Sequence, residues 1–425
     1  MKRIGSRAGK RQQARISAPD RSLTANAGLA AISELCDRLG VIGALDAAAG
    51  PVKQRDRGFG AGELLAGIAA AQLAGEDFLT GLDRQRADVA GQQITPVRGL
   101  ASTTAAGLAR RLTPGQWRAV ESGLAVVTGR MLSLLPAERV TALAGGPVTI
   151  DLDTTDVPAA ARASGRVAMR AGAGYFAGAL ARAAHEAHIG FAIGAKRIAP
   201  LWRLLAGIAE DAWHDAIEMG NAQVAVAEYC PDWWPASTRL LVRRVRLEPE
   251  QVSADPRSRR RRTLHPSQRD MLFPELAAQP AVYAYSFILT NLDVSTPGKA
   301  VAAEHWYRHR TTAENIFRDS KLGAALRHLP SGYPQVNMAW MWGALLAATI
   351  AAWLHQLTAV TAGKDIAAGH GVRGGKAMIA TLRWRLIAVP GRLIRHARHL
   401  TLRLPPGHYL LPEVLARLRE LPTPA

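Results

Sequence analysis

Residues 307–321 read YRHRTTAENIFRDSK, and the fold and chemistry of this chain are predicted most directly from this stretch. At about 3.6 residues per helical turn, side chains three, four and seven positions apart lie on one stripe of a helix. A carboxylate flanked by cations would then face a cleft, and the apolar side chains beside it would pack into a core. The side chains with this spacing are Tyr307, Arg310, Glu314 and Lys321.

The alternative is a solvated helix with intrahelical ion pairs, because a Glu near an Arg or Lys on a helix usually forms only such a pair. Four residue types at fixed offsets favour a functional pattern. The pattern Tyr-x2-Arg-x3-Glu-x6-Lys resembles the signature around the last acidic residue of bacterial insertion-sequence DDE transposases. The resemblance implies an α/β fold with an RNase H-like core, in which Glu314 is catalytic and binds metal. It also implies that Tyr307, Arg310 and Lys321 contact DNA beside the cut.

A strand is predicted within residues 147–157, PVTIDLDTTDV, because apolar residues alternate there with polar ones. The apolar set, which includes Ile150, is expected to face the core. In the transposases that the chain resembles, the first acidic residue ends the first strand and commonly precedes a threonine. The resemblance therefore makes Asp153 the first catalytic metal ligand. Asp151 points the same way and is the alternative, whereas Asp156 lies in the following turn and is a poorer candidate.

The next segment predicts a strand at 166–171, a glycine-rich turn, a helix at 176–188 and a strand at 189–196. The resemblance places the second catalytic aspartate just after the first of these strands, in a stretch like Arg-Ala-Asp-x-Gly-Tyr/Phe. Residues 170–175 read Arg-Ala-Gly-Ala-Gly-Tyr. Gly172 therefore occupies the position of the second aspartate.

Only 18 residues lie between Asp153 and Gly172. An RNase H-like core fits a hairpin of two strands and a helix there, whereas a bare crossover needs on the order of a dozen residues. The sheet is therefore expected to lack part of its strands, and the first strand of the order 3-2-1-4-5 becomes an exposed edge. Because a carboxylate that bridges two metal ions is hard to replace by glycine, we expect little or no strand cleavage or strand transfer.

The composition agrees with a nucleic-acid partner. The chain has 53 Lys+Arg against 34 Asp+Glu, a formal charge of +19, and phosphate is the natural counter-charge. A GC-rich genome would favour arginine equally well without any binding role. Residues 1–24 carry seven cations and one aspartate before any apolar periodicity, which predicts a disordered basic arm that can track phosphates.

Helical periodicity dominates residues 25–145, which predict an all-α DNA-binding module. A stripe of leucine and isoleucine from Leu29 to Leu39 predicts one helix with Gly40 as its stop, and Thr113-Pro114 is expected to open a long helix. A short helix there ends in Arg110 and Arg111 and could enter a DNA groove, as in helix-turn-helix proteins. An arginine pair favoured by the dipole at a helix C-terminus is an equally good explanation.

Residues 198–295 contain strand-like runs and predict a β-rich insertion, which similar transposases carry at this place. A basic stretch within it is expected to be an exposed loop that meets DNA phosphates, with a plain solvated loop as the alternative. Its cations are Arg257, Arg259, Arg260, Arg261 and Arg262. Trp233 and Trp234 could stack on an unpaired base, although core packing is the more common use.

Other segments point away from a membrane, a disulfide framework and a zinc protease. The uncharged run at residues 338–354 is only just long enough to cross a bilayer, and it suits a helix buried beneath a sheet better. The two cysteines, Cys36 and Cys230, fit a reducing cytoplasm. His185 and His188 are three residues apart, whereas the zincin pattern needs four.

The sequence thus predicts an insertion-sequence transposase that uses Mg²⁺ or Mn²⁺, binds double-stranded DNA at terminal inverted repeats and at the target, and acts as a homodimer in synapsis. We expect it to be cytoplasmic and nucleoid-associated in a bacterium, with impaired catalysis. The alternatives are a non-catalytic terminal-repeat-binding protein and a decayed product that does not fold stably. The predicted parts are an arm (1–24), a helical module (25–145), a core (146–197 and 296–360), a β-rich insertion (198–295) and a basic tail (361–425).

Overall fold

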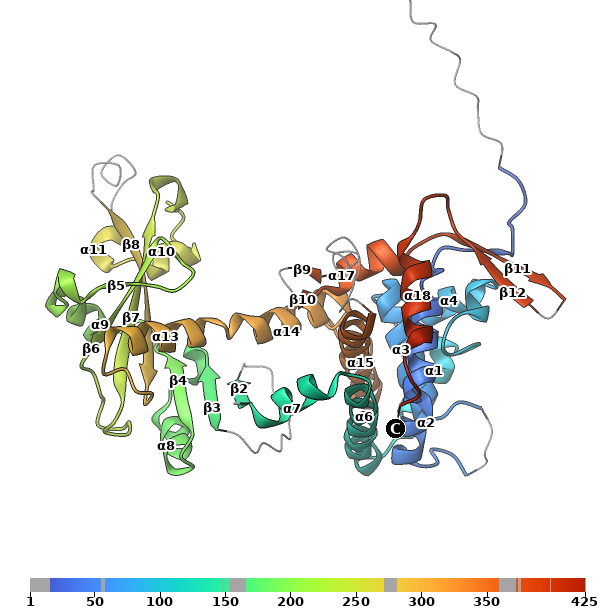
Figure 1. Cartoon of the computed structure of the whole chain (residues 1–425), viewed down its shortest axis with the longest axis horizontal. Helices are drawn as coiled ribbons and strands as arrows, with labels where there is room; N and C mark the ends of the chain where they lie inside the picture. The colour runs from blue at the N-terminus through green and yellow to red at the C-terminus, as the bar shows by residue number, and fades with distance from the viewer. Residues whose placement is uncertain are drawn as a thin grey trace, which may run out of the picture. The chain divides into compact units, whose positions relative to one another are not determined.

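The computed structural model describes residues 16–54, 58–146, 148–152, 166–270, 281–358, 372–373, 376–397 and 399–424. The chain divides into two compact units, one formed by residues 1–135 and 318–425 and the other by residues 136–317. The first unit is mainly helical, and the second carries a mixed sheet flanked by helices (Figure 1). The second boundary between the units falls inside α14 (Thr311–Gly323).

One hydrophobic core holds the helical unit together, because its helices contribute buried aliphatic faces to it. The core helices are α1 (Leu29–Leu39), α2 (Val41–Ala49), α3 (Ala61–Ala74), α4 (Gly81–Ala87), α5 (Ser102–Ala109), α6 (Pro114–Ser133), α15 (Pro334–Thr358), α17 (Ile379–Leu382) and α18 (Leu410–Glu420).

Local signals place the ends of these helices as the sequence predicts. Gly40 ends α1 in the left-handed region, at φ 59°, where glycine has no Cβ penalty. Thr113 caps α6, since its side chain accepts a hydrogen bond from the backbone N–H of Gln116. The prediction of a helix starting at Pro114 is confirmed.

Helix α15 is long and apolar enough to cross a membrane by length and composition, and it is the one such helix among the described residues. It packs most extensively against α3 and also contacts α1, α5 and α18. Trp340 is fully buried in that core, and its Nε1–H donates to the carbonyl of Ala325 at 2.9 Å. The expectation of a buried helix is confirmed, but the expected cover is wrong, because helices and not a sheet surround it.

The C-terminal residues differ from the expected basic tail. Strands β11 (Gly391–His396) and β12 (His399–Arg403) form an antiparallel sheet with β1 (Leu23–Thr24). Helix α18 buries an apolar stripe in the helical core, and this stripe explains why the segment folds back. Its members are Leu410, Leu411, Val414 and Leu418.

A seven-stranded sheet organises the second unit, in the order β2-β3-β4-β8-β7-β6-β5 (Figure 1). β2, β3 and β4 are parallel to one another, and the remaining neighbours pair antiparallel. The strands are β2 (Val148–Leu152), β3 (Val167–Ala171), β4 (Gly190–Gly194), β5 (His214–Asp215), β6 (Ala222–Ala227), β7 (Arg239–Leu247) and β8 (Val282–Thr290).

The predicted strand, helix and strand at 166–196 are confirmed as β3, α8 (Gly178–Glu186) and β4. Among the described residues β2 is the terminal strand of the sheet. Ile150 is 38% exposed, so the prediction that its face of the strand is buried is wrong. The polar face of β2, which carries Asp151, is the one covered by other residues of the unit.

Strands from the expected β-rich insertion continue the same sheet, since β8 pairs with β4. One side of the sheet receives α13 (Pro297–Arg308), whose buried residues join a cluster with Ala192, Val224 and Ile288. The basic stretch near residue 260 forms the short helix α10 (Arg259–Thr263), so the expectation of a loop there is wrong.

Candidate nucleic-acid interface

The carboxyl ends of β2, β3 and β4 meet at one edge of the sheet. The register pairs Leu152 with Ala171 and Ala171 with Ile193. Gly172 therefore directly follows Ala171, whose partner on β2 ends that strand and whose partner on β4 is the last residue but one. Ligand sites of parallel sheets form at such carboxyl ends. Asp153, the predicted first metal ligand, lies outside the described residues.

Tyr307, near the end of α13, reaches this edge of the sheet. Its hydroxyl donates a hydrogen bond to the carbonyl of Ala171 at 3.3 Å. A Cβ on Gly194 would stand 2.6 Å from the Tyr307 hydroxyl, closer than real contacts allow. The absence of a side chain at Gly194 is thus what lets Tyr307 lie across the ends of β3 and β4.

Arg310 lies against Gly172, the position expected to hold the second aspartate. A Cβ on Gly172 would stand 3.3 Å from Arg310 Nη1 and 3.6 Å from its Cζ. α13 ends at Arg308, and the Arg310 N–H donates to the carbonyl of Tyr307 at 3.1 Å before α14 begins. The prediction of one continuous helix is therefore wrong, because a short turn separates Tyr307 from the rest of its stripe.

The other two members of the stripe belong to α14. Glu314 is a residue of this helix, but its side chain lies outside the described part of the structure. Lys321 is exposed and lies beyond the boundary that ends the sheet-containing unit. The pairing of Glu314 with Asp153 around a metal ion therefore stays a prediction.

The described residues at the end of β3 do not fit a two-ion metal site. Mg²⁺ binds oxygen ligands such as carboxylates, and Gly172 supplies none. The cationic group of Arg310 lies 3.3–3.6 Å from the place that a Cβ on residue 172 would take. This position therefore offers a positive charge and no carboxylate to a second ion.

Asp151, the alternative first ligand, is part of an ion pair. Its two carboxylate oxygens each accept a hydrogen bond from Arg170, both at 2.7 Å. The Arg170 guanidinium also donates to the carbonyl of Trp306 and lies 5.1 Å from the centroid of its ring. Trp306 in turn donates to the Thr149 hydroxyl at 3.2 Å. Asp151 therefore helps to attach α13 to β2 and β3 and is not free to bind an ion.

A cavity of about 230 Å³ opens beside Tyr307 and Arg310 within the sheet-containing unit. Gly194, Ser286 and Phe287 contribute to its walls. Cations dominate the lining, and in the described part of the chain no carboxylate lines it. These cations are Arg197, Arg243, Arg259, Arg308 and Arg310.

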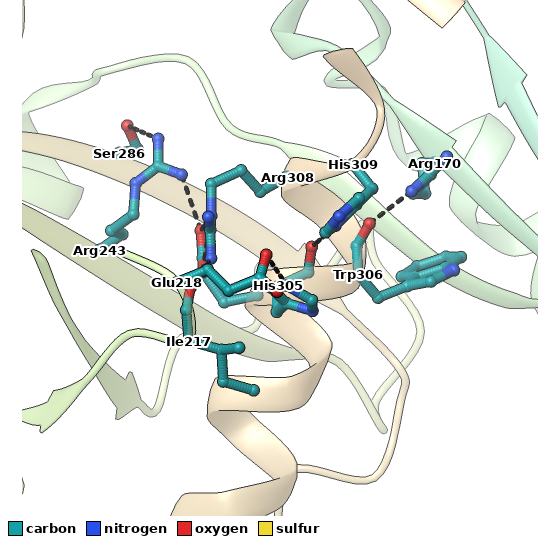
Figure 2. A network of polar contacts seen from close by, with 10 residues as sticks. Arg170, Ile217, Glu218, Arg243, Ser286, His305, Trp306, Arg308 and His309 are labelled. Carbon is teal, nitrogen blue, oxygen red and sulfur yellow. Dashed lines mark hydrogen bonds and ion pairs between the residues drawn. The ribbon is translucent and has the colours of Figure 1, made fainter. Parts of the chain in front are cut away.

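A buried glutamate holds two of these arginines in place, Arg243 and Arg308, which Figure 2 labels. Glu304 is fully buried and accepts hydrogen bonds from Arg243 at 2.7 Å and from Arg308 at 3.3 Å. Arg243 also donates to the Ser286 hydroxyl at 3.4 Å, and Arg308 donates to the carbonyl of Ile217. One carboxylate against five arginines leaves the cavity strongly positive.

Electrostatics at the cavity favour an anion. Partial loss of water around the guanidinium, and then the positive charges of Arg259 and Arg243, hold the pKa of Arg197 below its usual range. The guanidinium remains charged, because arginine starts from a very high pKa. A phosphate in the cavity would relieve this repulsion and would accept the bidentate hydrogen bonds that arginine offers.

Arg259, which is predicted to contact DNA, lines this cavity. The neighbouring arginines of α10 do not line it. Arg260 donates to the carbonyl of Gln251 at 3.2 Å, and Arg261 lies 3.7 Å from Asp270. Arg262 is exposed.

Two further pairs of residues were considered as DNA contacts, the arginines at 110 and 111 and the tryptophans at 233 and 234. Arg110 and Arg111 are exposed after the end of α5, and the Arg110 guanidinium lies 5.0 Å from the ring centroid of Tyr333. Trp234 is 4% exposed and packs against Phe191 and Phe176, which favours core packing over base stacking for this residue.

Sequence reasoning missed three arginines of the cavity and a group of potential metal ligands. Arg197, Arg243 and Arg308 lie far apart in the sequence, and only the sheet brings them together. His305 and His309 are four residues apart in and just after α13. That spacing was a usable signal for a metal site, but the transposase pattern of the same stretch obscured it.

Comparison with known proteins agrees with the pattern around Tyr307. No curated protein matches the chain. Residues 274–423, less than half of the chain, match the family model described as Transposase DDE domain group 1. The match includes α13, α14 and α15 but neither β3 nor Gly172. The mixed α/β architecture and this match support a DDE transposase.

Proposed function

We propose that this chain is by descent the DNA transposase of an insertion sequence, which binds terminal inverted repeats, and that catalysis in this copy is impaired. The observation that carries the proposal is the meeting of Tyr307 and Arg310 with the end of β3 beside an arginine-lined cavity. Both residues come from the stretch whose pattern resembles the transposase signature.

An incomplete RNase H-like core is the second element of the proposal. In the expected order 3-2-1-4-5, the first, fourth and fifth strands are parallel neighbours. β2, β3 and β4 have this arrangement, and β2 has no partner on its outer side among the described strands. The exposed position of Ile150 supports the loss of elements that would cover this edge.

DDE transposases normally use a divalent metal ion for hydrolysis and strand transfer. We propose that Asp153 and Glu314 are the remaining ligands for Mg²⁺ or Mn²⁺. Gly172 gives the site no third carboxylate, and Arg310 places a positive charge beside it. Losing a bridging ligand commonly abolishes turnover, so cleavage is expected to be weak or absent.

The DNA backbone is the anion that we assign to the cavity. Its arginines would bind one or more phosphates beside the strand ends, and such contacts position DNA without reading its sequence. Sequence selection would then come from the helical module of residues 25–145. We also propose a homodimer in synapsis and a location at the bacterial nucleoid.

A non-catalytic terminal-repeat-binding protein is the second candidate function. Gly172 and the contact with Arg310 favour it for this copy, because they remove a ligand without removing the basic surface. The match to the transposase family favours the enzyme as ancestor.

One paired experiment tests both candidates. The purified chain is mixed with end-labelled DNA carrying the inverted repeats that flank its reading frame, and with shuffled DNA of equal length. Binding is measured by gel shift, and cleavage is measured with Mg²⁺ or Mn²⁺. Selective binding without cleavage supports an impaired transposase that retains DNA recognition. Efficient cleavage contradicts the impairment, and absence of selective binding contradicts both functions.

A further inference from the structure

Three side chains capable of binding a metal ion converge at the end of α13, on the network drawn in Figure 2. His305 lies in the last turn of the helix, and His309 follows its end. Glu218 comes from the turn between β5 and β6. One ligand atom from each residue lies within 4.8 Å of the other two.

Hydrogen bonds orient two of these groups toward one another. Nδ1 of His309 lies 2.7 Å from the carbonyl oxygen of His305, which can only accept a hydrogen bond. Nδ1 therefore carries the proton, and the lone pair of the His309 ring is on Nε2. Metal-binding histidines commonly have their second nitrogen fixed in this way. Nε2 of His305 lies 3.3 Å from Oε2 of Glu218.

The backbone also holds the turn against the helix. Glu218 has a φ of 54°, in the left-handed region that side chains rarely adopt. The adjacent carbonyl of Ile217 accepts a hydrogen bond from Arg308, which Glu304 anchors in the core. The carboxylate is thus presented to the histidines by a turn with a defined conformation.

We propose that Glu218, His305 and His309 bind a divalent transition-metal ion, with zinc as the best fit and the fourth position left to water. Two imidazole nitrogens and one carboxylate are a common zinc ligand set. Imidazole nitrogen suits Zn²⁺ or Co²⁺, whereas Mg²⁺ prefers an all-oxygen shell. A plain His305–Glu218 ion pair would not need the third ligand that His309 provides.

The ligands of this site are different residues from the carboxylates assigned to DNA cleavage, and the inference does not depend on the proposed function. Its ligands come from the β5–β6 turn and α13. A bound ion would join that turn to the end of the helix that carries Tyr307. Metal binding is therefore expected to stabilise the sheet-containing unit, because the assembled ligands of the folded chain bind the ion more tightly than the dispersed ligands of the unfolded chain.

Cobalt provides a direct test, since Co²⁺ bound by nitrogen and oxygen ligands absorbs visible light. The metal-free full chain is titrated with Co²⁺ in the presence of excess Mg²⁺, which occupies all-oxygen sites. We expect one equivalent to produce visible bands, and zinc to displace it and raise the unfolding temperature. Bands that Mg²⁺ abolishes, or absence of bands, would overturn the proposal.

Substitutions locate the ion. His309→Gln and Glu218→Gln alter exposed side chains, and each is expected to weaken Co²⁺ binding by about tenfold or more. His188→Gln is the matched control, because His188 is an exposed histidine of the same unit outside the cluster. It should bind Co²⁺ like the parent chain. Equal binding by all three variants would show that the ion sits elsewhere.

Discussion

The guanidinium group of Arg310 lies against Gly172, so that a Cβ added to the glycine would be 3.3 Å from Nη1. This relationship brings together two positions that the resemblance to DDE transposases assigns to the catalytic site. Arg310 belongs to the stretch that resembles the transposase signature, and Gly172 stands where the resemblance would place the second catalytic aspartate. Under the proposed function, the site keeps a cation and lacks a carboxylate.

The first prediction concerns Gly172→Asp. The backbone of Gly172 is extended, with φ −74° and ψ 171°, so an aspartate adds no backbone strain there, and the flexible end of Arg310 has to move slightly to admit its Cβ. Its carboxylate would pair with Arg310, which would lower DNA affinity several-fold without restoring cleavage. Gel shift and cleavage assays beside Gly172→Asn measure both effects. Cleavage by Gly172→Asp alone would show that the rest of the catalytic core is intact.

Arg197→Gln is expected to weaken DNA binding equally on all sequences. Removing one arginine that binds a phosphate should reduce the slope of log affinity against log salt by about 1. Arg246→Gln is the matched control, because Arg246 is exposed on β7 and does not line the cavity. Titrations at several salt concentrations distinguish the variants. Equal slopes for Arg197→Gln and the parent chain would argue against phosphate in the cavity.

Gly194→Ala should destabilise the chain by about 1–3 kcal/mol, as overpacking of a close contact commonly does. The new methyl group would stand 2.6 Å from the Tyr307 hydroxyl. Tyr307→Phe removes that oxygen and should cost about 0.5–1.5 kcal/mol, because its hydrogen bond can no longer form. A double-mutant cycle is measured by urea unfolding. Gly194→Ala should lower the free energy of unfolding less in the Tyr307→Phe background than in the parent chain. Additive costs would contradict this contact.

Glu304→Gln is expected to lower the free energy of unfolding by about 3 kcal/mol, because it leaves two partly buried arginines without their counter-charge. Glu304 is fully buried between Arg243 and Arg308. Glu413→Gln is the control, since Glu413 pairs with Arg417 at the surface of α18 and such pairs contribute about 0.5 kcal/mol or less. Chemical denaturation measures both. If both substitutions lower the free energy of unfolding by a similar small amount, water screens the charge of Glu304.

The two thiols should differ in reactivity. Burial raises the pKa of Cys36 to about 12, whereas Cys230 is exposed. A disulfide reagent at pH 8 should modify one thiol in the native chain and both in denaturant. The unfolded Cys36 thiol ionises first, from its ordinary value of 9.0, so its contribution to stability is constant below that pH and falls between 9.0 and about 12. Rapid modification of both native thiols would contradict the core packing of α1.

Local sequence signals predicted much of the fold. The α1 stripe, the left-handed stop at Gly40 and the Thr113 cap depend on neighbours within one or two turns, as does the strand, helix and strand from 167 to 194. The core packing of α18 was not predicted, because the cations of the C-terminal segment masked its apolar stripe.

The candidate site was less predictable, because tertiary pairing assembles it. The signature stretch indicated Tyr307 and Arg310, but periodicity alone could not reveal the break after Arg308. Arg197 and Arg243 reach the same cavity only because β8 pairs with both β4 and β7. Those long-range pairings leave no local signal in the sequence.

Photo-crosslinking tests most directly whether DNA binds at the ends of β3 and β4. Ala173 is exposed and lines the arginine cavity, whereas Ala183 is exposed on α8 outside it. Each is replaced by p-benzoylphenylalanine in the full chain, which is then irradiated with labelled terminal-repeat DNA. The account predicts a strong crosslink from position 173 and little from position 183. Crosslinking from position 183 alone, with DNA affinity retained in both variants, would contradict it.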